Sequence, residues 1–267
     1  MTPNWMIALD IDGTVLHEDG TLADATREQV ARVAELGHEV TIATGRSVAM
    51  TLPVVDRLGI APKYIVCANG AITLKRDPDA PLGYTREHVE TFDPSEVLTT
   101  IKGHLADARY AVEDEEGMFS FSGGDFPEAG FEANGQHVEF DELLKVRATR
   151  VVVISPEHAM EDFLKVVERM GLHRVSYNVG WTAWLDIAPD GVNKSVALER
   201  VREAVRIPRT RVIAIGDGRN DIDMLAWAAR SGRGIAMGQA PHEVKDAANE
   251  VTSTDLEDGV AKVLSAL

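Results

Sequence analysis

The sequence has a single cysteine, few basic residues for its acidic content, and no long apolar run. Cys67 is alone among 267 residues, so no disulfide can form within the chain, as expected of a reducing cytoplasm. The formal net charge of -16 makes nucleic acid and anionic membrane surfaces unfavourable partners. No apolar run reaches the length of a membrane span, and no basic segment typical of a secretion signal precedes the first one. We therefore expect a cytoplasmic protein.

Short apolar runs alternate with helical patterns at both ends of the chain. Apolar residues at helical spacing follow the first run, over 25–36, and recur after 193. Strand, helix and strand in succession predict right-handed crossovers in a parallel sheet. The expected strands are residues 6–9, 39–43, 63–68, 211–215, 234–237 and 250–252.

The middle of the chain is more polar and less regular. Its last two strand candidates, 175–179 and 182–187, suggest an antiparallel pair that turns at Gly180. We therefore predict an α/β fold: a doubly wound, Rossmann-like core with a parallel sheet and an inserted α+β domain. The core would comprise residues 1–80 and 189–267, and the insertion residues 81–188.

Two carboxylates follow the first expected strand. In an extended chain Asp10 and Asp12 point the same way, and they repel each other unless a cation lies between them. A hard divalent ion with oxygen ligands, Mg²⁺ above all, would relieve that repulsion. Gly13 then permits a sharp turn. A polar turn without function is the alternative interpretation of this stretch.

Polar residues also follow the other core strands, and the carboxyl ends of parallel strands form the ligand-binding edge of such sheets. Asp10, Asp217 and the backbone carbonyl of Asp12 could bind a metal ion. The Thr44 hydroxyl, Asn220 and Lys194 could bind a phosphoryl group. Arg46, Asn69 and Asp221 are the other polar residues near these strand ends, and Gly45 lies beside Thr44.

Some of these residues also have an interpretation that involves no function. Lys194 could be a surface lysine and Asn69 part of a plain turn, while Arg46 could cap a helix or pair with an acid. The full set nevertheless suits one chemistry. A carboxylate can attack phosphorus to form an aspartyl-phosphate, and a second acid two residues on can protonate the leaving oxygen and then activate water.

Four stretches carry polar residues in a fixed order along the chain: residues 10–14 (DIDGT), 43–46 (ATGR), 193–194 (NK) and 216–221 (GDGRND). They resemble the four motifs of the haloacid-dehalogenase-like hydrolases, in that family's order, and the insertion resembles the cap of the Cof-type branch (class IIB). The resemblance spans the whole chain. It implies that Asp10 is nucleophile and metal ligand, and that Asp12 is general acid/base and metal ligand through its carbonyl. An aspartate at position 12 is typical of the phosphatases and phosphomutases.

The resemblance also implies roles for the other strand-end residues. Asp217 would be the acidic metal ligand, and Asp221 would orient Lys194 or a metal-bound water. Arg46 is expected, like Asp221, in the layer around the site, and contact of Arg46 with the substrate stays an open alternative. The expected phosphate-binding residues are Thr44, Gly45, Asn69, Lys194 and Asn220.

Together these observations predict a Mg²⁺-dependent phosphatase of small phosphorylated metabolites, whose cap selects the substrate. Sugar phosphates are the leading class by resemblance, followed by phosphorylated cofactors such as flavin or pyridoxal phosphate. Two alternatives remain open: a phosphomutase acting on sugar phosphates, and a non-catalytic regulator that binds a phosphorylated ligand. We expect a monomer or a homodimer.

Overall fold

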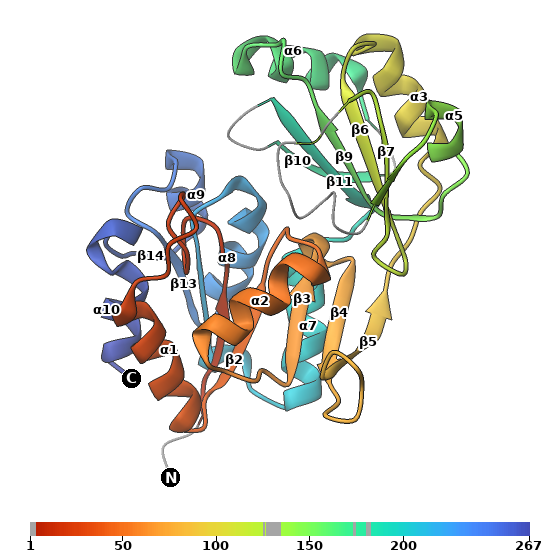
Figure 1. The fold of residues 1–267 in the computed structure, drawn as a ribbon. Helices are drawn as coiled ribbons and strands as arrows, with labels where there is room; N and C mark the ends of the chain where they lie inside the picture. Colours follow the sequence, from red (N-terminus) through yellow and green to blue (C-terminus); the bar gives the residue numbers. More distant parts are fainter. Residues whose placement is uncertain (1–3, 125, 127–134, 173–174, 180–182) are drawn as a thin grey trace. The chain divides into compact units, whose positions relative to one another are not determined.

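The computed structural model describes residues 4–124, 126, 135–172, 175–179 and 183–267 (Figure 1). The chain divides into two compact units, one of residues 1–88 and 193–267 and the other of residues 89–192. None of the described helices is long and apolar enough to span a membrane. Residues 180–182, which include the expected turn at Gly180, lie outside the described part.

The first unit is built on an eight-stranded sheet in the order β14-β13-β12-β1-β2-β3-β4-β5. Neighbouring strands from β14 to β3 run parallel, and β3 and β4 are antiparallel. β1 lies at the centre with every residue buried, as its apolar sequence requires. The strands are β1 (Met6–Leu9), β2 (Glu39–Ala43), β3 (Tyr64–Cys67), β4 (Ile72–Arg76), β5 (Tyr84–Val89), β12 (Val212–Gly216), β13 (Arg233–Ala236) and β14 (Glu250–Val251).

Helices cover both faces of this sheet. In Figure 1, α1 and α2 lie in front of the strands and α7 lies behind them. Helices α1 and α10 pack together, as do α7, α8 and α9, so the core is doubly wound as the sequence predicted. The helices are α1 (Asp24–Glu35), α2 (Val48–Leu58), α7 (Lys194–Val205), α8 (Ile222–Ala229), α9 (His242–Ala247) and α10 (Gly259–Ser265), with short 3₁₀ turns η1 (Ala68–Gly70), η2 (Arg209–Arg211), η3 (Arg219–Asp221) and η4 (Asp255–Glu257).

The second unit has its own sheet of six strands, ordered β10-β11-β9-β6-β7-β8. All its described pairings are antiparallel except that of β7 with β8. Phe163 of α6 packs with Tyr110 and Val153 of the sheet in one buried cluster. The elements are α3 (Ser95–His104), β6 (Arg109–Asp114), β7 (Phe119–Ser122), β8 (Gly135–His137), α5 (Phe140–Leu143), β9 (Ala148–Ile154), α6 (Met160–Met170), β10 (Val175–Val179) and β11 (Trp184–Pro189).

The structure differs from the sequence-based expectation mainly at the unit boundaries. The units divide after residues 88 and 192, whereas the expected boundaries followed 80 and 188. β5 pairs at the edge of the first unit's sheet, and its mostly exposed side chains give no pattern of a buried core strand. Pro53 does not interrupt α2, which is continuous from Val48 to Leu58.

Candidate active site

The strand order brings the polar strand-end residues to one edge of the core sheet. β12, β1, β2 and β3 are adjacent and parallel, so their carboxyl ends lie side by side. Asp10 follows β1, Thr44 follows β2 and Asp217 follows β12, while Asn69 lies in η1 directly after β3. The edge therefore gathers side chains that are far apart in the sequence.

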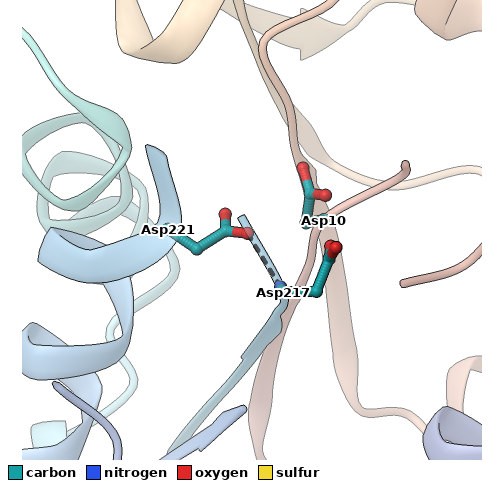
Figure 2. A group of neighbouring side chains, drawn as sticks. All are labelled: Asp10, Asp217 and Asp221. Carbon is teal, nitrogen blue, oxygen red and sulfur yellow. Dashed lines mark hydrogen bonds between the residues drawn. The ribbon is translucent and has the colours of Figure 1, made fainter. Parts of the chain in front are cut away.

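Three aspartates form a buried cluster at this edge. One carboxylate oxygen each from Asp10, Asp217 and Asp221 lie within 4.8 Å of one another. Figure 2 shows the side chains of Asp217 and Asp221, from the segment after β12, converging with that of Asp10, from the segment after β1. Asp221 is held in place because its Oδ2 accepts hydrogen bonds from the backbone N–H groups of Asp217 and Gly218, both at 3.0 Å. The cluster is thus fixed by the fold.

Lys194 lies against this cluster. It is fully buried, and its Nζ donates to Asp10 Oδ1 at 2.6 Å and to Asp221 Oδ1 at 2.7 Å. It is the first residue of α7, whose N-terminus is capped by the Asn193 side chain. Burial alone disfavours its charge, but the two carboxylates together outweigh burial and raise the pKa of Lys194 above its ordinary value.

The ammonium of Lys194 does not neutralise the cluster. Burial and the nearby Asp221 carboxylate raise the pKa of Asp10 well above its usual range. The same two causes raise the pKa of Asp217 to about 7, although the Thr14 hydroxyl donates to Asp217 Oδ1 at 3.0 Å. When all three carboxylates are ionised, the single ammonium leaves an excess of negative charge that a divalent cation would offset. The all-oxygen donor set of the three aspartates suits a hard divalent ion.

Asp12 lies apart from the cluster. Its side chain is 59% exposed and pairs with Arg46, whose Nε donates to Asp12 Oδ2 at 2.9 Å while a terminal nitrogen donates to Oδ1. Of the two interpretations of Arg46, the structure therefore shows pairing with an acid, and Ser47 caps α2 instead. The Asp12 carboxylate is free of the metal-binding cluster, and contact of its backbone carbonyl with a metal stays a prediction.

The remaining predicted residues meet around the segment after β2. Asn220 Nδ2 donates to Asn69 Oδ1 at 3.0 Å, and the Asn69 backbone N–H donates to the Thr44 carbonyl at 3.0 Å. A Cβ atom on Gly45 would lie 3.2 Å from Asn69 Oδ1, so the absence of a side chain at 45 lets Asn69 approach closely. Thr44 is fully buried. These residues form a connected polar group around the segment that follows β2.

Two residues that sequence reasoning missed hold the turn after Asp12. Thr14 donates to Asp217, as described above, and Gln239 Nε2 donates to the carbonyl oxygen of Gly13. Gln239 follows β13, the neighbour of β12, so it too lies at a strand end. That position is the one signal in the sequence that could have identified it.

Comparison with known proteins agrees with this arrangement. The family model of haloacid dehalogenase-like hydrolases matches residues 7–264. A 5-amino-6-(5-phospho-D-ribitylamino)uracil phosphatase of Bacillus subtilis, YitU, is 29% identical, with 98% of this chain and 97% of the relative covered. A pyridoxal phosphate phosphatase of Escherichia coli, YbhA, is 28% identical, with 97% of both chains covered.

Solved structures show the same fold. A haloacid dehalogenase-like hydrolase from B. subtilis superposes with a TM-score of 0.80 at 23% identity, covering 98% of this chain and 99% of that one. A class IIB sugar phosphatase of the superfamily superposes with a TM-score of 0.78 at 22% identity, covering 98% of both chains. With a buried aspartate cluster at the strand ends, the chain belongs to the haloacid dehalogenase-like hydrolases, as a phosphatase, and its second, inserted sheet gives it the fold of a class IIB structure.

Proposed function

We propose that this protein is a Mg²⁺-dependent phosphatase that hydrolyses small phosphate monoesters through a phosphoryl group carried on Asp10. The observation that carries the proposal is the different setting of two nearby carboxylates. Asp10 is buried against Lys194, whereas Asp12 is exposed and outside the aspartate cluster. Two carboxylates in different environments can take two different roles in one reaction.

Each step uses residues already placed at this edge. The Thr44 hydroxyl, Lys194 and Asn220 would hold the phosphoryl oxygens while the Asp10 carboxylate attacks phosphorus. Asp12 would give a proton to the departing oxygen, then remove one from the water that hydrolyses the aspartyl-phosphate. To do so, Asp12 would leave its pairing with Arg46, take up a proton from solvent and face the substrate oxygen as a carboxylic acid. Bound Mg²⁺ would supply positive charge for the phosphoryl oxygens and for the carboxylates of Asp10 and Asp217.

The substrate class follows from relatives and not from the site. YitU and YbhA are named for a phosphorylated ribityl compound and for pyridoxal phosphate. We propose sugar phosphates or sugar-like phosphate esters first, and phosphorylated cofactors second. Residues 89–192, as a cap, would select among them.

A panel of phosphorylated metabolites tests this proposal. Release of inorganic phosphate, lost in the Asp10→Asn variant, is the expected result. An isomerised phosphate ester without free phosphate would instead identify a phosphomutase. Tight binding of a phosphorylated compound with no turnover would identify a regulator.

Metal exchange tests the cofactor. Mg²⁺ keeps a strict octahedron with several waters, whereas Ca²⁺ accepts more ligands and can bind the Asp10 carboxylate through both oxygens, away from phosphorus. We expect activity with Mg²⁺ and a marked loss with Ca²⁺, measured as phosphate release after treatment with EDTA. Equal activity with both ions, or full activity in EDTA, would contradict the metal assignment.

A further inference from the structure

The turn that carries Asp12 is held from two sides. On one side, a Cβ atom on Gly13 would lie 2.3 Å from Asp217 Oδ2, so the backbone passes directly against that carboxylate. Gly13 also has a φ of 72°, in the left-handed region that favours glycine. On the other side, the Gly13 carbonyl accepts a hydrogen bond from Gln239 Nε2. The backbone of Gly13, the residue after Asp12, therefore lies between Asp217 and Gln239.

Gln239 is itself anchored at both ends. Its Oε1 accepts a hydrogen bond from the Asp255 backbone N–H at 3.2 Å, so the side-chain amide bridges the turn and η4. The segment that carries it is fixed because the Gly238 N–H donates to the Ser253 carbonyl at 3.0 Å. A Cβ atom on Gly238 would lie 2.8 Å from the Ser253 carbonyl carbon, which shows how closely the two segments pack. Gln239 is thus a support that does not depend on the aspartate cluster.

We propose that Gln239 is a positioning residue for Asp12, a role that rests on the function proposed above. Packing does not fix the direction of the Asp12 side chain, because 59% of it is exposed. Its placement depends on the Arg46 pairing and on the backbone of the turn. The donor half of the Gln239 amide fixes the orientation of the Gly13–Thr14 peptide, and with it the path of the chain at Asp12.

The consequence should appear only where the proton of Asp12 matters. Proton transfer is sensitive to placement, and an error of about 1 Å in a catalytic group can cost roughly a hundredfold in rate. An alkyl phosphate needs a proton on its leaving oxygen, whereas p-nitrophenolate leaves with little help. Loss of the Gln239 donor should therefore slow phosphoryl transfer from a sugar phosphate and spare the nitrophenolate burst from p-nitrophenyl phosphate.

Three variants separate the two halves of the amide. Gln239→Glu keeps an acceptor for the Asp255 N–H but cannot donate to Gly13 in its ionised form. Gln239→Lys keeps a donor and loses the acceptor. Asp255→Asn is the matched control, because it removes the contact of the Asp255 carboxylate with His17 and leaves the backbone N–H in place. Both substrates are phosphate monoesters, so their rate ratio cancels a general effect of the new charges on binding.

The measured quantity is the ratio of first-step rates on the two substrates, by rapid quench. We expect Gln239→Glu to lower the first-step rate on the sugar phosphate about tenfold relative to the rate on p-nitrophenyl phosphate. A tenfold loss corresponds to a displacement of the Asp12 carboxyl group smaller than about 1 Å. Gln239→Lys and Asp255→Asn should keep the parent's ratio. Equal slowing on both substrates, or the same ratio change for Glu and Lys, would overturn the proposal. Turnover by Asp10→Asn, measured alongside, would overturn the phosphatase mechanism itself, whereas an inert Asp10→Asn with a normal Gln239→Glu would overturn only the role of Gln239.

Discussion

At the scale of one residue, Lys194 shows how a buried positive charge offsets the buried carboxylates of the site. Its ammonium contacts Asp10 and Asp221 in full burial, where an unpaired charge is costly. Asp217, the third member of the cluster, has its pKa raised by burial and by Asp221. Stability and metal binding therefore depend on the same few charges.

Replacement of Lys194 by methionine should destabilise the metal-free protein. The change leaves the Asp10 and Asp221 carboxylates buried without their cation, and breaking such a pair costs about 3–5 kcal/mol. Urea unfolding in EDTA measures the free energy of unfolding. The double variant Lys194→Met/Asp221→Asn should recover part of the loss, because one buried carboxylate has gone. A single variant as stable as the parent would contradict this balance.

The raised pKa of Asp217 predicts a pH dependence of the metal-free protein. Its pKa of about 7 in the folded state lies above the ordinary 3.8. A raised folded-state pKa gives a stabilising contribution that is complete below the unfolded value and is lost as the pH rises through about 7. Mg²⁺ should therefore raise the melting temperature more at pH 8 than at pH 6. Asp217→Asn should show a smaller difference, because the Asp10 carboxylate, whose pKa is also raised, remains in the cluster. An equal Mg²⁺ effect on the parent at both pH values would refute the assignment.

At the scale of the elements, the polar ends of the parallel core strands were predictable from the sequence, whereas the added strands β4 and β5 and the contacts of Gln239 were not. Asp10, Thr44 and Asp217 each end an apolar run, so their convergence follows from parallel pairing alone. The antiparallel β4 and the edge strand β5 lack that pattern of apolar run and polar end. The role of Gln239 depends on β13 lying beside β12 and on η4 lying within reach, which are tertiary facts that no local pattern encodes.

The contact between η1 and the start of α7 gives a prediction at this scale. A Cβ atom on Gly70 would lie 2.4 Å from the Asn193 carbonyl oxygen, so Gly70→Ala should push apart the Asn69 turn and the helix that begins with Lys194. Gly59→Ala is the matched control, because Gly59 also has a positive φ but has nothing within 4 Å of its Cβ position.

The control should lose about 1–2 kcal/mol from the left-handed backbone alone. Gly70→Ala should lose about 1–3 kcal/mol more through the clash, and its kcat should fall with it. Thermal unfolding and phosphate release measure both effects. Equal losses of stability and activity in the two variants would contradict the expectation that the close approach of η1 and α7 matters for the site.

At the scale of the whole molecule, the chain consists of two units with separate sheets and separate cores. Every residue of the candidate site belongs to the first unit. The second unit is a continuous insertion, residues 89–192, whose sequence gave no motif for a substrate. Reaction class could therefore be argued from sequence, whereas substrate identity could not.

Deletion of residues 89–192 behind a flexible linker tests this division. The first unit keeps its eight-stranded sheet, in which only β5 is shortened, by Val89, so we expect it to fold and unfold cooperatively. It should still release phosphate from p-nitrophenyl phosphate, at a reduced rate, and should discriminate poorly among phosphorylated metabolites. Circular dichroism and the metabolite panel provide the measurements. An unfolded product, or one with the parent's selectivity, would count against the proposed roles of the two units.

The central claim is that Asp10 carries the phosphoryl group while Asp12 moves the protons. The most direct measurement is rapid mixing of Asp12→Asn with p-nitrophenyl phosphate, followed by mass analysis of the acid-quenched protein. The first step should survive and the second, which needs Asp12 as base, should stall. We predict a nitrophenolate burst near one equivalent and a phosphoryl group on Asp10. A variant that slows without a burst and carries no phosphoryl group on Asp10 would contradict the account.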